Sequence, residues 1–64
     1  MESRQRVKEL KSKCDMILHA IVGPNAINFW WNSPNKAFDM RPPKEMFEED
    51  PKRVYRYLLD QVQR

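Results

Sequence analysis

The 64-residue sequence contains a single cysteine, a single histidine and a single glycine, and each scarcity excludes a class of site. One cysteine, Cys14, forms no internal disulfide. Together with the lone histidine, His19, it cannot supply the cysteine and histidine ligands that structural zinc sites use. A chain whose one glycine is Gly23 also lacks a glycine-rich loop that could hold phosphate. The sequence therefore predicts no metal site and no cofactor.

Groups suited to catalysis are equally scarce. A catalytic site needs a nucleophile or an acid–base pair supported by its neighbours. Cys14 falls on an apolar helical stripe, where a thiol stays protonated, and His19 lies off that stripe without an evident partner. The run Glu48, Glu49 and Asp50 lacks the spacing of a calcium loop and is more typical of an acidic connector. We therefore predict a protein that is not an enzyme.

Long hydrophobic runs are missing as well. No apolar stretch approaches the roughly 20 residues that a membrane span needs, so no membrane association is expected. The charged N-terminus does not resemble a signal peptide, and a free thiol is typical of a reducing compartment, which predicts a cytoplasmic protein. With 41% hydrophobic and 33% charged residues, the composition favours a folded domain over disorder. The net charge of +3 tilts the chain slightly towards anionic partners.

Helical periodicity is the main signal that the chain does contain. Apolar residues recur at helical spacing from position 3 to 22, with Ser3 as N-cap and Gly23-Pro24 as the stop. The stripe consists of Val7, Leu10, Cys14, Ile17 and Ile21, with Leu18 alongside. The same spacing also fits about two heptads of a coiled coil, which is too short to specify one, so a helix facing the core is the preferred interpretation.

A second helix is predicted over residues 25–32, ending before Pro34 because the residue before a proline disfavours helical geometry. Its apolar positions span an arc of about 200°, roughly twice the stripe of an ordinary surface helix. These positions are Ala26, Ile27, Phe29, Trp30 and Trp31. Two interpretations remain open: the helix is central and covered on both sides, or part of its aromatic surface awaits a partner.

The rest of the chain is punctuated by prolines and capping residues. Asn35 can cap a short turn, Pro43 can open a short helix, and Asp50 with Pro51 can start the last helix. The expected inner face of that last helix is Tyr55, Leu58, Leu59 and Val62, with Val54 at its edge. The predicted fold is an all-α, small single domain of about four or five helices, with long first and last helices and short ones between. We expect Trp30, Leu58 and Leu59 to be among the most buried residues.

The segment WWNSPNKAFDMRPPKEMF, residues 30–47, resembles the toxin-binding domain of Xre/MbcA/ParS-type antitoxins. The pattern of that family is Trp-Leu-x-x-Pro-Asn-x-Ala-Leu-Gly-Gly-x-x-Pro-x-x-Leu-Leu. Identical positions are Trp30, Pro34, Asn35, Ala37 and Pro43, and other large apolar residues stand at the leucines: Trp31, Phe38, Met46 and Phe47. Asp39-Met40 replaces Gly-Gly, and methionine does not easily take the positive φ that glycine permits. The resemblance divides the chain into an N-terminal helix, 1–24, and an antitoxin-like region, 25–64.

The resemblance implies a function in protein binding. In this family the domain binds a RES-type toxin, an NAD-consuming enzyme, and its C-terminal end reaches towards the toxin's active site. Tyr57, Asp60 and Arg64 would then be candidate contacts. The expected helix-turn-helix half is missing, so a stand-alone domain could instead serve a different target. A small phage or mobile-element protein that grips a host protein would fit this description.

The leading hypothesis is therefore a protein-binding module that inhibits or redirects its partner sterically. An outward tyrosine among arginines is typical of an interface, since both types are enriched at binding hot spots. The predicted partner surface is Trp31, Arg53, Arg56, Tyr57, Asp60 and Arg64. The alternative is a small basic regulator that binds nucleic acid through Lys8, Lys11, Lys13, Arg53 and Arg56. A homo-oligomer with a structural role is a third interpretation.

Overall fold

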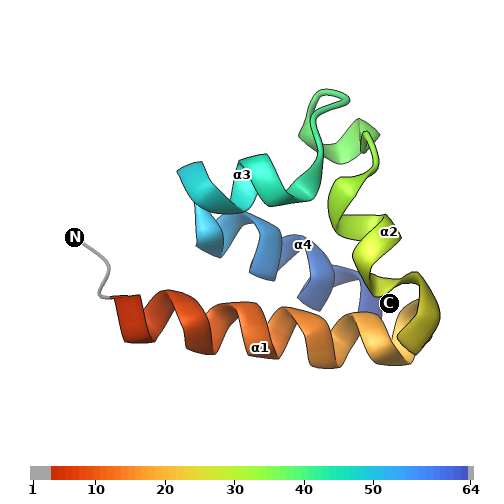
Figure 1. Ribbon diagram of the computed structural model, residues 1–64, viewed down its shortest axis with the longest axis horizontal. Coiled ribbons are helices and arrows are strands. Elements are labelled where there is room, and N and C mark those ends of the chain that lie inside the picture. The colour runs from red at the N-terminus through yellow and green to blue at the C-terminus, as the bar shows by residue number, and fades with distance from the viewer. Residues whose placement is uncertain (1–3, 64) are drawn as a thin grey trace.

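The computed structural model describes residues 4–63, which form four α-helices joined by short turns (Figure 1). The helices are α1 (Arg4–Ile21), α2 (Ile27–Asn32), α3 (Pro43–Glu49) and α4 (Pro51–Val62). Two 3₁₀ turns, Pro24–Ala26 and Lys36–Phe38, stand before and after α2. Within residues 4–63 there is no strand, and one isolated antiparallel bridge joins Asn35 to Arg41. The predicted all-α fold is confirmed; the expected N-cap, Ser3, lies outside the described residues.

Helix α4 is the centre of the packing. It contacts α1 on one side and α3 on another, while the short α2 contacts both α3 and α1. Figure 1 shows α1 along the bottom, α3 at the top, α4 between and behind them, and α2 at the right-hand end. An α1–α4 pair is thus closed at one end by α2 and covered by α3.

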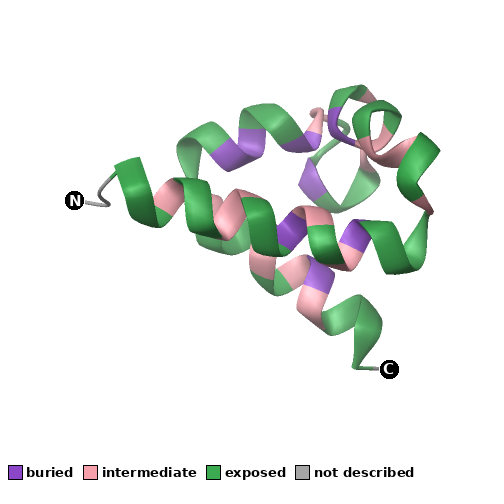
Figure 2. Cartoon of the chain, turned by 60° about the horizontal axis from the view of Figure 1, so that its bottom comes forward, coloured by how far each residue is buried: buried purple, intermediate pink, exposed green. Residues whose placement is uncertain are grey.

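The buried stripes of α1 and α4 differ from those expected. The fully buried pairs are Cys14 with Leu18 on α1 and Val54 with Leu58 on α4, both at i, i+4 spacing. Ile21 and Val62, expected on the inner faces, are 44% and 47% exposed, so this part of the prediction is wrong. On both helices the last turn is exposed beyond the buried positions, and Figure 2 shows the C-terminal end of α4 projecting from the rest of the molecule.

Three residues were expected to be among the most buried, and one of them is fully buried in the structure. Leu58 is confirmed, whereas Trp30 and Leu59 are only partly buried. Successive helical residues point about 100° apart, so the two neighbouring indoles cannot both face the core, and Trp31 takes that place. Phe29 on the same helix is 74% exposed. Part of the aromatic arc of α2 therefore stays uncovered, so the helix is not covered on both sides.

Burial gives Cys14 the character of a core thiol. Its side chain is completely buried beside Leu18, as expected from the apolar stripe. Desolvation raises the pKa of Cys14 to about 11, with a smaller contribution from the negative charge of Asp15 that the positive charge of Lys11 partly opposes. Because this value lies above the ordinary thiol pKa, Cys14 stays protonated in the folded protein at neutral pH.

The turn between α2 and α3 has a left-handed backbone. Asn35 caps it as predicted, since its side-chain oxygen accepts a hydrogen bond from the backbone N–H of Ala37 at 2.9 Å. Asp39 and Met40 both have positive φ, at 56° and 66°. Methionine therefore does adopt the glycine-like conformation that its side chain disfavours. The backbone N–H of Met40 donates to the carbonyl of Asn35 at 2.9 Å, and this hydrogen bond helps to hold the strained geometry.

The acidic run does not form a connector. Glu48 and Glu49 belong to α3, and only Asp50 separates that helix from Pro51, the first residue of α4. The guanidinium of Arg41 donates two hydrogen bonds of 2.8 Å to the carboxylate of Glu49. This bidentate contact lowers the pKa of Glu49 and ties the turn before α3 to the end of that helix.

Replacing Met40 by glycine should stabilise the protein. The left-handed conformation costs a non-glycine residue about 1–2 kcal/mol, and the extra chain entropy of glycine takes back about 0.5–1 kcal/mol. We expect Met40→Gly to raise the free energy of unfolding by about 0.5–1 kcal/mol in urea titrations. The matched control is Met16→Gly, an exposed methionine inside α1, which should lose about 1 kcal/mol. Equal losses in both variants would contradict the backbone assignment.

Candidate binding groove

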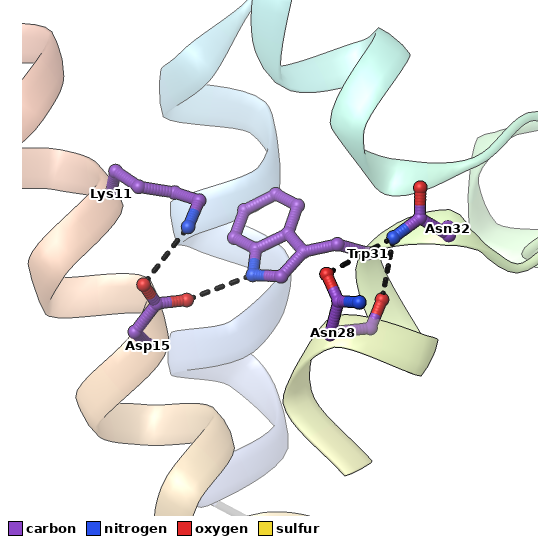
Figure 3. Close-up of polar contacts among 5 residues, drawn as sticks. All are labelled: Lys11, Asp15, Asn28, Trp31 and Asn32. Carbon is purple, nitrogen blue, oxygen red and sulfur yellow. Dashed lines mark hydrogen bonds and ion pairs between the residues drawn. The ribbon is translucent and has the colours of Figure 1, made fainter. Parts of the chain in front are cut away.

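Trp31 is held between helices by one hydrogen bond and two aromatic contacts. Its indole N–H (Nε1) donates to a carboxylate oxygen of Asp15 on α1 at 2.8 Å (Figure 3). Its ring meets Phe47 of α3 edge-on, with centroids 5.5 Å apart, and Trp30 in the same way at 5.2 Å. Only 5% of Trp31 remains exposed. Trp31 therefore links α2 to both α1 and α3.

Lys11 completes this contact from the solvent side. Its ammonium lies 2.9 Å from the second carboxylate oxygen of Asp15 and 4.8 Å from the centroid of the Trp31 ring (Figure 3). The carboxylate thus accepts from the indole with one oxygen and from the lysine with the other. Both partners of the ion pair are more than one-third exposed, so its electrostatic contribution to stability is small. Its effect is on orientation, because it fixes Asp15 where the indole N–H needs an acceptor.

Trp31 also forms part of the floor of a surface groove. This groove lies between α1, α2 and α3 and has a volume of about 490 Å³. Its apolar floor is Val7, Trp31 and Phe47, one residue from each helix. The size is within the range of about 300–1,000 Å³ that is common for ligand sites. This site, however, is a groove that is open to solvent and not an enclosed cavity.

The polar lining of the groove is rich in hydrogen-bond donors. Three lysines, Lys8, Lys11 and Lys44, stand against the single acid Glu48. Asn28 also lines the groove, and its side-chain oxygen accepts from the amide nitrogen of Asn32 at 3.3 Å (Figure 3). The amide nitrogen of Asn28 has no hydrogen-bond partner among residues 4–63. The groove therefore presents positive charge and free donors around an apolar floor.

Two residues of the expected partner surface, Trp31 and Tyr57, are less exposed than the sequence suggested. Trp31 was expected in the partner surface and as a ring that could also pack internally; it is 5% exposed and lines the groove. Tyr57 is half-buried, because the turn before α3 folds back and places Phe38 edge-on against its ring, with centroids 5.2 Å apart. Helix periodicity alone gave no sign of this fold-back. Tyr57 therefore helps to cover the core.

The remaining residues of that expected surface lie on α4 or beyond it. Arg53 is exposed, lies 5.8 Å over the Phe38 ring and donates to the carbonyl of Ala37 at 3.5 Å. Arg56 and Asp60 are exposed, and Arg64 lies outside the described residues. None of the hydrogen bonds or ring contacts of Trp31 reaches α4. The structure thus separates Trp31 from the α4 residues with which it was grouped.

The basic residues expected to bind nucleic acid do not share one face. Lys8 and Lys11 line the groove, whereas Lys13, about 140° around α1 from Lys8, lies 6.0 Å over the Tyr55 ring. Arg53 is occupied with Phe38. Lys44, which sequence reasoning missed, joins Lys8 and Lys11 only because α3 docks beside α1. No signal in the sequence reports that docking.

The described residues contain neither a metal-binding cluster nor a membrane-spanning helix, and the chain matches no known protein in three comparisons. Across residues 4–63, no three His, Cys, Asp or Glu side chains lie close enough to hold a metal ion, and no helix is long and apolar enough to cross a membrane. Comparison of the chain with family models, with curated proteins and with solved structures gave no match. The functional interpretation therefore depends on the chain's own residues.

The two tryptophans should differ in their contribution to stability. Trp31→Phe removes a donor to a carboxylate and part of a buried ring, so we expect the free energy of unfolding to fall by about 2 kcal/mol. Trp30→Phe is the matched control, because Trp30 is half-buried and no hydrogen bond of its indole is found among the described residues. It should lose less than half as much. Urea denaturation followed by circular dichroism measures both, and equal losses would mean that the Asp15 contact contributes nothing.

Proposed function

We propose that this chain is a non-enzymatic protein-binding module of the antitoxin type, which docks onto a partner protein and inhibits or redirects it sterically. The observation that carries the proposal is the backbone of residues 30–47. Asp39 and Met40, which stand at the Gly-Gly of the antitoxin pattern, both have the positive φ that a glycine pair permits. The backbone at these two positions therefore has the conformation that the pattern would require, although neither residue is glycine.

The neighbouring positions of the pattern support the same proposal. Helix α2 ends before Pro34, Asn35 caps the following turn, and Pro43 is the first residue of α3. Met46 and Phe47, at the two leucines that end the pattern, are both buried in the core. These residues have the structural roles that their types would need in the pattern, whereas Trp30, at its first position, is only partly buried.

Docking would engage a substantial part of so small a molecule. A standard protein–protein interface covers about 800 Å² on each partner, which is about one-sixth of the chain's surface of 4866 Å². A large exposed aromatic side chain, Phe29, is available on α2, the helix that also contributes Asn28 and Trp31 to the groove. Nucleic-acid binding is less well supported, because the basic residues are divided among separate sides of the molecule.

The proposal predicts a protein partner that is retained without nucleic acid. A tagged chain is expressed in its native host, the lysate is treated with nuclease, and bound material is identified by mass spectrometry and quantified. We expect one protein in roughly equal molar amount. If the partner is a RES-type toxin, its consumption of NAD should fall as the purified chain is added.

The matched control is Leu58→Glu, which places a charge at a fully buried position and should abolish both folding and capture. Retention of the same protein by this variant would mark the capture as non-specific. Retention of nucleic acid alone, lost after nuclease treatment, would replace the proposal with the nucleic-acid alternative.

A further inference from the structure

The groove between α1, α2 and α3 combines an apolar floor with a positively charged rim. Its floor offers apolar contact through Val7, Trp31 and Phe47. Its rim offers positive charge from both sides, with Lys8 and Lys11 on α1 and Lys44 on α3. An occupant must therefore present apolar side chains at its centre and negative groups at its margins.

We propose that this groove binds an acidic amphipathic segment of the partner protein, with its apolar side chains on the Trp31–Phe47 floor and its carboxylates at Lys8, Lys11 and Lys44. The inference rests on the proposed function and names the surface and the chemistry that it uses. Amphipathic helices commonly bind in grooves of this kind, with apolar anchors every three or four residues. Acids flanking those anchors would meet lysines on both sides of the groove.

Charge complementarity favours this occupant over others. Lysine and the amide nitrogen of Asn28, which has no partner among residues 4–63, only donate hydrogen bonds, and carboxylates only accept them. Glu48 is the one acid in the lining, so a basic segment would meet net repulsion. The phosphates of a nucleic acid would meet the same lysines, so an oligonucleotide is the competing probe.

The indole N–H of Trp31 can serve as an NMR probe of binding in the groove. Lys11 is paired with Asp15, and Asp15 accepts the indole hydrogen bond of Trp31. A carboxylate that arrives at Lys11 competes with Asp15 for the ammonium and so changes the acceptor that the indole N–H meets. The indole N–H resonance of Trp31 should therefore shift on binding, while that of Trp30, which has no such contact among the described residues, should shift less.

The test uses the whole chain and a defined probe. The probe is a helix-forming peptide of about twelve residues in which Glu and Asp flank a stripe of Leu and Phe. A second peptide has Gln and Asn in place of the acids, and a third probe is a single-stranded oligonucleotide of equal charge. Binding is measured by calorimetry, and the site is mapped by NMR. The acidic peptide should bind, the amide peptide should bind far more weakly, and the oligonucleotide should not displace the peptide.

Two double variants locate the interaction. Lys8→Gln with Lys44→Gln removes two charges from the rim, and no internal ion pair of either lysine is found among residues 4–63. We expect affinity for the acidic peptide to fall roughly fivefold. The control, Lys36→Gln with Arg56→Gln, removes the same charge from exposed positions outside the groove and should bind like the parent. Circular dichroism confirms that both variants are folded.

Several results would overturn the inference. These are no binding of the acidic peptide, equal binding of the amide peptide, displacement by the oligonucleotide, or equal losses in the two double variants. Failure here is distinguishable from failure of the proposed function. A host protein could be captured and bind the groove double variant with the same affinity as the parent. That result would support the proposed function and would show that the groove is not the docking surface.

Discussion

The hydrogen bond from the indole of Trp31 to Asp15 joins α1 to α2, two helices with little other contact. The same ring packs edge-on against Phe47, so α3 is positioned by the same side chain. The chain has a single cysteine and so no internal disulfide, and within residues 4–63 the core cluster consists of eight buried side chains. Such a core leaves little margin in stability, so a single well-placed aromatic side chain has a large effect on the geometry.

This constraint also shapes the surface. Because Trp31 closes the gap between three helices, its edge becomes the floor of the groove, and Lys11 is held over its ring by Asp15. Lys8 and Lys44 then stand on opposite sides of an apolar strip. The proposed docking surface is thus a consequence of how the core is closed, and a substitution that loosens Trp31 would alter stability and binding together.

Helix positions and their boundaries follow well from the sequence, because prolines, Asn35 and helical periodicity report local structure. The all-α class and the burial of Cys14 and Leu58 needed no more than that. What the sequence could not show is how helices dock. Phe38 folding back onto Tyr57, and Lys44 arriving beside α1, depend on contacts between distant segments. The partial burial of Tyr57 could not be predicted for this reason, because an outward position on a helical wheel says nothing of the turn that covers it.

The central claim is that the partner occupies the groove and not the exposed side of α4. Site-specific photo-crosslinking in the captured complex tests it most directly, with a photoreactive amino acid placed at Lys44 in one variant and at Arg56 in another. Both positions are exposed, so neither replacement should disturb the core. The account predicts an efficient crosslink to the partner from position 44 and little from position 56. A crosslink from position 56 with none from position 44 would contradict it.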